Sequence, residues 1–216
     1  MTSADWETEA AIRASLERDT PDIPLIGEEG GGDRGPRYWT VDPIDGTTNF
    51  LLGFPVVAVS VALVVEGRPG VAAIRAPILD LAFSAVRGGG GRCGDRSMTV
   101  STREPQRAIV ATALPFRESR LLPRNLPVLQ AVFDRIEDTR RAGAAALDLA
   151  WVAAGVFDGY FELNQSEWDV AAGALLVEEA GGVVTDWEGG RKYLSGNVIA
   201  GSPATHAVLL EAARTG

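Results

Sequence analysis

The sequence predicts a mixed α/β protein with layered sheets, because its two halves follow different patterns. In the first half, several β-branched segments follow one another with only turns between them, which is typical of an antiparallel or mixed sheet. In the second half, strand-like and helix-like segments alternate, which favours a partly parallel sheet covered by helices. A chain of 216 residues, 46% of them hydrophobic, can bury a sizeable core. We place the change of pattern near Arg140, so that residues 1–140 and 141–216 form two halves of one compact unit.

The first half is predicted to begin with a helix over residues 5–18, where Trp6, Ile12 and Leu16 recur near helical spacing. Gly88 to Gly91 are expected at a hairpin tip, and residues 66–70 in a turn. The expected strands are residues 25–26, 38–41, 56–65, 71–75 and 81–86, with a further one at 99–100.

The second half is predicted to alternate between the two kinds of element. The expected strands are residues 109–114, 157–163, 182–186 and 198–200, and the expected helices are 125–135, 144–154, 170–180 and 203–214. His206 falls in the last helix, where a surface position is expected.

Composition excludes several classes of function. The net charge of −9 gives no general attraction to nucleic acid or to an anionic membrane. The single cysteine, Cys93, excludes an internal disulfide and a multi-cysteine zinc site, and it fits a reducing cytoplasm. No run of apolar residues is long enough to span a membrane, and residues 1–9 lack the pattern of a secretory signal. We therefore expect a cytoplasmic protein without nucleic-acid or membrane partners.

The most informative stretch runs from Asp42 to Phe50 and reads Asp-Pro-Ile-Asp-Gly-Thr-Thr-Asn-Phe. Two carboxylates lie three residues apart, and the proline between them fixes φ. Gly46 allows a close backbone approach, and a helical turn beginning at the two threonines would offer amides to an anion. Rigid acids beside an anion site suit a divalent cation that bridges to a phosphate. On these residues alone, an acidic loop that caps a helix remains an alternative.

Two further acidic sites have similar alternatives. Glu28 and Glu29 end a short predicted strand that can lie beside residues 38–41, which would bring Glu28 near Asp42, although paired acids in a glycine-rich loop are often only solvated. Asp169 opens a predicted helix, where a carboxylate is favourable as a cap in any case. Glu178 and Glu179 are expected on a solvated helix end.

Taken in order, three blocks resemble the inositol monophosphatase family of lithium-sensitive, magnesium-dependent sugar phosphatases. They are Gly27-Glu28-Glu29, the nine residues from Asp42 to Phe50, and Trp168-Asp169-Val170-Ala171-Ala172-Gly173, which continues to Glu179-Ala180-Gly181-Gly182. The resemblance covers the chain from about Asp5 onward. It implies a layered α-β-α-β-α sandwich, without the helix that usually comes first, and a homodimer.

The resemblance also implies the composition of a magnesium site and of a substrate site. The implied Mg²⁺ ligands are the carboxylates of Glu28, Asp42, Asp45 and Asp169 and the backbone carbonyl of Ile44, supported by Glu29. The implied substrate contacts are Gly46, Thr47, Thr48, Ala145, Glu162 and Asp169. Thr47 paired with Asp5 would orient and activate the attacking water.

Two features depart from the family pattern. Asp5 lies close to Met1, where the family usually has a preceding helix, so a frayed Asp5 is expected. Glu167 is expected to add negative charge near the substrate entrance.

The implied activity is Mg²⁺-dependent hydrolysis of a small polyol phosphate, first of all an inositol monophosphate. Histidinol phosphate and fructose 1,6-bisphosphate are alternative substrates within the superfamily. A truncated, non-catalytic relative that acts on partner proteins or RNA machinery is the alternative of another class.

Overall fold

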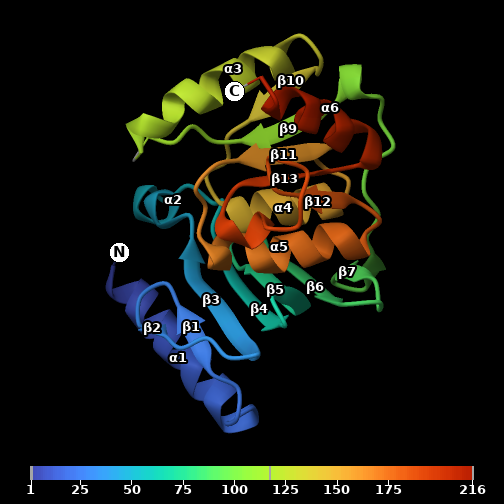
Figure 1. Cartoon of the computed structure of the whole chain (residues 1–216). Helices are drawn as coiled ribbons and strands as arrows, with labels where there is room; N and C mark the ends of the chain where they lie inside the picture. Colours follow the sequence, from blue (N-terminus) through green and yellow to red (C-terminus); the bar gives the residue numbers. More distant parts are fainter. Residues whose placement is uncertain (1, 117, 216) are drawn as a thin grey trace.

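The computed structural model describes residues 2–116 and 118–215 and shows five layers in the order helix, sheet, helix, sheet, helix (Figure 1). The layered sandwich implied by the resemblance is confirmed. The helices are α1 Ser3–Asp19, α2 Thr47–Leu52, α3 Leu122–Phe133, α4 Ala145–Ala153, α5 Glu167–Glu179 and α6 Pro203–Ala213. None of the described helices is long and apolar enough to cross a membrane.

The first sheet has eight strands in the order β2-β1-β3-β4-β5-β6-β7-β8. Its strands are β1 Leu25–Gly27, β2 Gly31–Gly32, β3 Arg37–Asp45, β4 Ala58–Val65, β5 Arg68–Ala76, β6 Leu81–Val86, β7 Gly91–Cys93 and β8 Arg96–Ser97. All neighbours are antiparallel except β1 and β3, which run parallel with Gly27 opposite Val41. The parallel pair matters for the site, because both strands end at the same edge.

The second sheet has five strands in the order β10-β9-β11-β13-β12. Its strands are β9 Ile109–Thr112, β10 Asp138–Arg140, β11 Gly159–Glu162, β12 Val183–Thr185 and β13 Val198–Gly201. β10, β9 and β11 are parallel, whereas β13 and β12 are antiparallel to their neighbours. The chain changes sheet between Ser97 and Ile109, and a division into halves near Arg140 stays a prediction.

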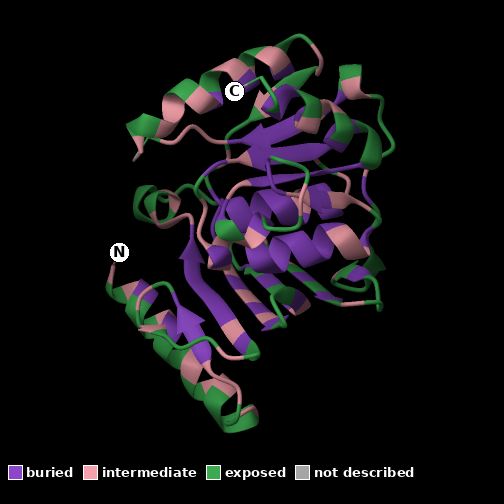
Figure 2. Ribbon diagram, viewed as in Figure 1, coloured by how far each residue is buried: buried purple, intermediate pink, exposed green. Residues whose placement is uncertain are grey.

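The main core lies between the two sheets, around α4 and α5 (Figure 2). Both helices are rich in alanine, so they can lie close together. A Cβ atom on Gly173 would lie 2.4 Å from Cβ of Leu149, which shows that the closest approach requires glycine. A second apolar cluster lies on the outer face of the five-stranded sheet, under α3 and α6. The second sheet is therefore covered on both faces, by α4 and α5 on one side and by α3 and α6 on the other.

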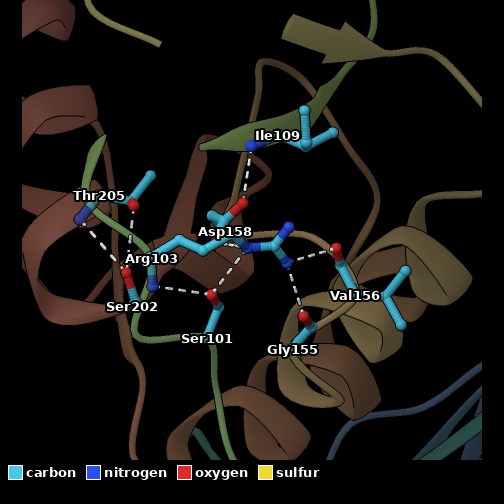
Figure 3. Close-up of polar contacts among 8 residues, drawn as sticks. All are labelled: Ser101, Arg103, Ile109, Gly155, Val156, Asp158, Ser202 and Thr205. Carbon is cyan, nitrogen blue, oxygen red and sulfur yellow. Dashed lines mark hydrogen bonds and ion pairs between the residues drawn. The ribbon is translucent and has the colours of Figure 1, made fainter. Parts of the chain in front are cut away.

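An ion pair between the exposed Arg103 and the buried Asp158 fastens the loop between the sheets (Figure 3). Asp158 is fully buried and accepts a hydrogen bond of 2.6 Å from the Ile109 amide. Arg103 pairs with Asp158 at 3.0 Å and donates to the carbonyls of Gly155 and Val156. The Arg103 guanidinium therefore neutralises a carboxylate inside the second sheet and also fixes the end of α4.

Several local predictions are wrong. Residues 99–100 form no strand. The glycine-rich tip joins β6 to β7 as a hairpin, and β7 pairs in turn with β8, two short strands that the sequence did not reveal. His206 is buried, because its helix packs on the second sheet, and its Nε2 lies 2.9 Å from Oγ1 of Thr185. Glu178 and Glu179 are not simply solvated. Glu178 pairs with Arg87 at 3.0 Å, and Glu179 accepts the amides of Gly88 and Gly90.

Candidate active site

The register of β1 against β3 places two of the predicted acids side by side. Gly27 lies opposite Val41, and the amide of Glu28 donates a 3.1 Å hydrogen bond to the Val41 carbonyl. Glu28 and Asp42 are the next residues of the two parallel strands, so their side chains leave the sheet at the same edge. Asp42 is buried, whereas Glu28 is exposed to solvent.

The segment after Asp42 makes a tight bend. The strand pairing shifts between Asp42 and Asp45, and Oδ1 of Asp42 accepts a 2.9 Å hydrogen bond from the Ile44 amide. Gly46 has φ of 89°, and a Cβ there would lie 2.9 Å from the Val56 carbonyl oxygen. Glycine is therefore required before the short helix α2, which begins at Thr47.

Asp45 points across the structure to the start of α4. Its Oδ1 accepts the Ala145 amide at 3.0 Å, and its Oδ2 accepts the Ala146 amide at 2.8 Å and the Leu147 amide at 3.3 Å. These amides have no partner within the helix, so the buried carboxylate caps α4 from another element. The predicted substrate contact through the Ala145 backbone thus involves an amide that Asp45 already occupies.

Asp169 lies in the first turn of α5, where its Oδ2 accepts the Ser166 amide at 2.7 Å. The helix start is tied to the first sheet, because the Ser60 hydroxyl donates to the Trp168 carbonyl at 3.1 Å. Glu167 does not add charge to the substrate entrance as expected. It is buried, pairs with Arg34 at 2.9 Å and accepts a hydrogen bond from the Tyr38 hydroxyl.

Three of the predicted ligands lie close enough to influence one another's ionisation. The charges of Asp169 and Glu28 both act on Asp42, and the charge of Asp169 also acts on Glu28. Desolvation, followed by the charges of neighbouring acids, raises the pKa of Glu28 and raises that of Asp42 well above its usual range. Desolvation and the Asp169 charge raise the pKa of Asp45 to about 8, and desolvation also raises the pKa of Asp169. Neighbouring carboxylates cannot all be ionised unless a cation or shared protons neutralise them.

This set of side chains fits a hard divalent cation. The donors are all oxygen atoms, which suits Mg²⁺ with several of its waters retained. As they stand, no three acidic, histidine or cysteine side chains within residues 2–116 and 118–215 are grouped closely enough to hold a metal ion. Asp45 is one reason for this lack of a closed group, because both of its carboxylate oxygens accept hydrogen bonds from amides of α4 and so face that helix. The residues are gathered in one place, and binding a cation requires their carboxylates to turn toward it.

Asp5 is ordered, and the expectation that it frays is wrong. It is fully buried in the first turn of α1, where it shares a capping box with Thr2. Its Oδ1 lies 3.3 Å from the hydroxyl oxygen of Thr47, which is also 3.1 Å from the Ile44 carbonyl oxygen. The structure therefore brings together the two residues to which the resemblance assigns water activation.

The remaining predicted contacts lie on the second sheet and at the start of α2. Glu162 ends β11, and it accepts hydrogen bonds from the hydroxyl of Tyr160 at 2.8 Å and from the amide of Gln165. Desolvation raises the pKa of Glu162 to about 7. Thr48 is exposed on α2.

One acid near the site was not singled out from the sequence. Asp148 lies on α4, is buried, and has an Oδ1 atom without a hydrogen-bond partner among the described residues. Desolvation and the charges of Asp45 and Glu162 raise its pKa well above the usual range. A signal was available, because an aspartate in an otherwise apolar helix needs a reason to be buried.

A bundle of acids at the N-terminal ends of two central helices, beside a short helix that begins after an Asp-Pro-Ile-Asp-Gly bend, defines a phosphatase-type protein. Comparison with known proteins agrees. The chain matches the inositol monophosphatase family over residues 1–216, and it belongs to that family. Proteins of this family are metal-dependent phosphatase-type proteins.

Individual relatives carry two kinds of name. "Nus factor SuhB" of Vibrio cholerae is 41% identical over 216 residues, which cover 98% of this chain and 81% of that protein. The crystal structure of the extragenic suppressor protein suhB from Bartonella henselae has a TM-score of 0.95 at 40% identity and covers 100% of this chain and 86% of that one. Inositol monophosphatase from Anabaena (Nostoc) sp. PCC 7120 has a TM-score of 0.92 at 34% identity, with 98% and 86% covered.

Proposed function

We propose that this protein is a Mg²⁺-dependent phosphomonoesterase that hydrolyses a small polyol phosphate, with an inositol monophosphate as its preferred substrate. The observation that carries the proposal is the parallel register of β1 and β3, which sets Glu28 beside Asp42, with the charge of Asp169 acting on both acids so that the three repel one another until a cation binds. Glu28, Asp42, Asp45, Asp169 and the carbonyl of Ile44 are the proposed ligands. Bound Mg²⁺ would supply the positive charge that activates water and stabilises the leaving oxygen.

The protein residues have distinct roles in the proposed reaction. The Thr47 hydroxyl, held by Asp5, orients the attacking water, and Asp5 accepts its proton through Thr47. The amides of Gly46 and Thr47 face the phosphate at the start of α2. We assign the hydroxyl groups of the polyol to Glu162, Asp169, Thr48 and the Ala145 backbone, whose amide would have to leave Asp45 to make this contact. No histidine or cysteine nucleophile is needed, and the ring of the single histidine, His206, is engaged by Thr185 while the single cysteine, Cys93, lies in β7.

We also propose that the protein forms a homodimer through the face of α2. Three large apolar side chains of α2 and Phe54, which follows the helix, are exposed, with exposed fractions of 42% for Phe50, 66% for Leu51, 77% for Leu52 and 48% for Phe54. An exposed apolar patch of this kind is typical of a protein contact. A cytoplasmic location stays a prediction.

A second candidate function comes from the relatives called "Nus factor SuhB", a name that implies action within a transcription assembly. A regulatory role of this kind would use protein surfaces rather than direct contact with RNA, because the net charge is −9. We expect such a role to be independent of the Asp45 and Thr47 side chains, so substitution of these residues would separate catalysis from regulation.

Phosphate release from inositol 1-phosphate, with Mg²⁺ and with excess chelator, tests the proposal. Histidinol phosphate and fructose 1,6-bisphosphate in the same assay separate the alternative substrates. Mg²⁺-dependent release that is fastest with inositol 1-phosphate supports the proposal. Absence of release from all three substrates, although Mg²⁺ still binds, would favour the regulatory function. A melting temperature indifferent to Mg²⁺ would contradict the metal site itself.

A further inference from the structure

Helix α1 is attached to the protein through acids rather than through an apolar face. All of its residues, Ser3–Asp19, lie within the described range, and only Asp5 and Glu9 among them are buried. The two acids are four residues apart, so they lie on the same face of the helix, one turn from each other. Asp5 faces Thr47, and Glu9 faces the turn that carries Glu28. In Figure 1, α1 lies along β1, β2 and β3 at the edge of the first sheet.

Glu9 is 3% exposed and fully engaged by the turn after β1. Its Oε2 accepts the amide of Glu29 at 2.8 Å, and its Oε1 accepts the amide of Gly30 at 3.0 Å. Arg13 neutralises the carboxylate at 3.0 Å and also donates to the Gly31 carbonyl at 3.1 Å. A buried carboxylate is stable only with such partners, so the turn and the helix fix each other.

The turn is shaped to admit this carboxylate. A Cβ on Gly27 would lie 2.2 Å from Cδ of Glu9, and a Cβ on Gly30 would lie 2.7 Å from its Oε1. Glycines therefore stand on both sides of Glu28 and Glu29, and the Glu9 carboxylate fills the space that they leave. The backbone on either side of Glu28 is held by the Val41 carbonyl and by Glu9.

We propose that Glu9 is a positioning residue, which holds the turn of residues 27–30 so that Glu28 stays beside Asp42, and which thereby sets the Mg²⁺ affinity of the site. This inference rests on the proposed function. Asp5 lies on the same face of α1 as Glu9. The packing of this one helix therefore positions both Asp5, the partner of Thr47, and the turn that carries Glu28. Loss of the Glu9 contacts weakens the metal site without removing a ligand.

The test compares Glu9→Gln with Glu7→Gln, the same chemical change on the exposed face of the same helix. Mg²⁺ binding is measured by calorimetry, and hydrogen exchange is followed at the amides of Glu29 and Gly30. In Glu9→Gln we expect a Mg²⁺ Kd about 10-fold higher, as for other residues that orient a metal ligand, and faster exchange at both amides. In Glu7→Gln both quantities stay at the wild-type values. With saturating Mg²⁺, kcat of Glu9→Gln returns toward the wild-type value.

The outcomes separate the inference from the proposed function. If the wild-type protein does not bind Mg²⁺, the proposed function fails and the inference falls with it. If the wild type binds Mg²⁺ and Glu9→Gln binds it equally well, only the inference is overturned, whatever the melting temperature does. If Glu9→Gln does not fold, Arg13→Met, which removes the outer contact of the same carboxylate, must raise the Kd by a smaller factor; an unchanged Kd in that variant overturns the inference.

Discussion

Asp45 and Ala146 join the end of β3 to the start of α4, because the Ala146 amide donates a 2.8 Å hydrogen bond to Oδ2 of Asp45. One carboxylate thus caps a central helix and is also a proposed metal ligand. Its pKa is raised to about 8 by desolvation and by Asp169, so the protein without a cation holds this acid in an unfavourable environment.

Substitution of Asp45 tests this double role. We expect Asp45→Asn to lower kcat/KM by at least about 100-fold, because a ligand of the proposed cation is lost. The variant should also lose the rise in melting temperature that Mg²⁺ gives to the wild type. Asp95→Asn, the same change at an exposed position of the first sheet, is the matched control and should keep both properties. Full turnover in Asp45→Asn would refute its metal role.

The hydroxyl of Thr47 can be removed without a change of shape. We expect Thr47→Val to lower kcat by about 10²- to 10⁴-fold, the usual contribution of a positioned proton transfer. Thr47→Ser keeps the hydroxyl beside Asp5 and should retain most of the activity. Steady-state kinetics at saturating Mg²⁺ distinguishes the two variants. Equal activity of the valine and serine variants would show that the Thr47–Asp5 contact is not part of the reaction.

The Arg103–Asp158 ion pair should contribute to stability and not to the chemistry. Arg103→Met leaves the buried Asp158 carboxylate without its cation, and we expect the free energy of unfolding to fall by about 1–3 kcal/mol. Arg107→Met is the matched control, because Arg107 is exposed nearby. Urea denaturation of the two variants measures the difference. If they are equally stable, the pair is no more than a solvated contact.

His206 should make stability depend on pH. Burial lowers its pKa, so the folded protein favours the neutral ring, whereas the unfolded chain takes up a proton at its ordinary value of 6.5. Stability from this residue is therefore complete above about pH 7.5 and is lost as the pH falls through about 6.5. When the pH is lowered from about 7.5 to about 5.5, we expect the melting temperature of His206→Gln to fall less than that of the wild type. Parallel pH profiles would contradict this assignment.

The proposed dimer depends on exposed apolar side chains of α2. The double substitution Leu51→Ser and Leu52→Ser should convert a dimer to a monomer, because it removes apolar surface that the contact would bury. Both side chains are exposed in the single chain, so the serines can point into solvent. Light scattering coupled to size-exclusion chromatography measures the mass directly. A wild-type protein that is already monomeric would rule out the dimer before any variant is made.

Much of the fold could be predicted because local patterns and packing agree. The segments Ala58–Val65 and Leu81–Val86 are rich in residues that favour strands and place every second residue in the core, and the small residues of α4 and α5 permit the close approach seen at Gly173. Short elements without such a pattern escaped prediction. β2, β7, β8 and β10 have two or three residues each and form only because a neighbouring strand supplies their hydrogen bonds.

The sequence by itself determined which acids could meet a cation, because the Asp-Pro-Ile-Asp-Gly bend and the two separate acidic motifs have a defined local chemistry. Only the tertiary structure decided how these acids are held. The parallel register of β1 and β3 sets Glu28 beside Asp42, and α4 turns Asp45 toward its amides. Likewise, Glu9 and His206 look like ordinary polar helix residues in the sequence. Burial gives each a partner far away along the chain, and no local pattern records which distant groups will surround a side chain after folding.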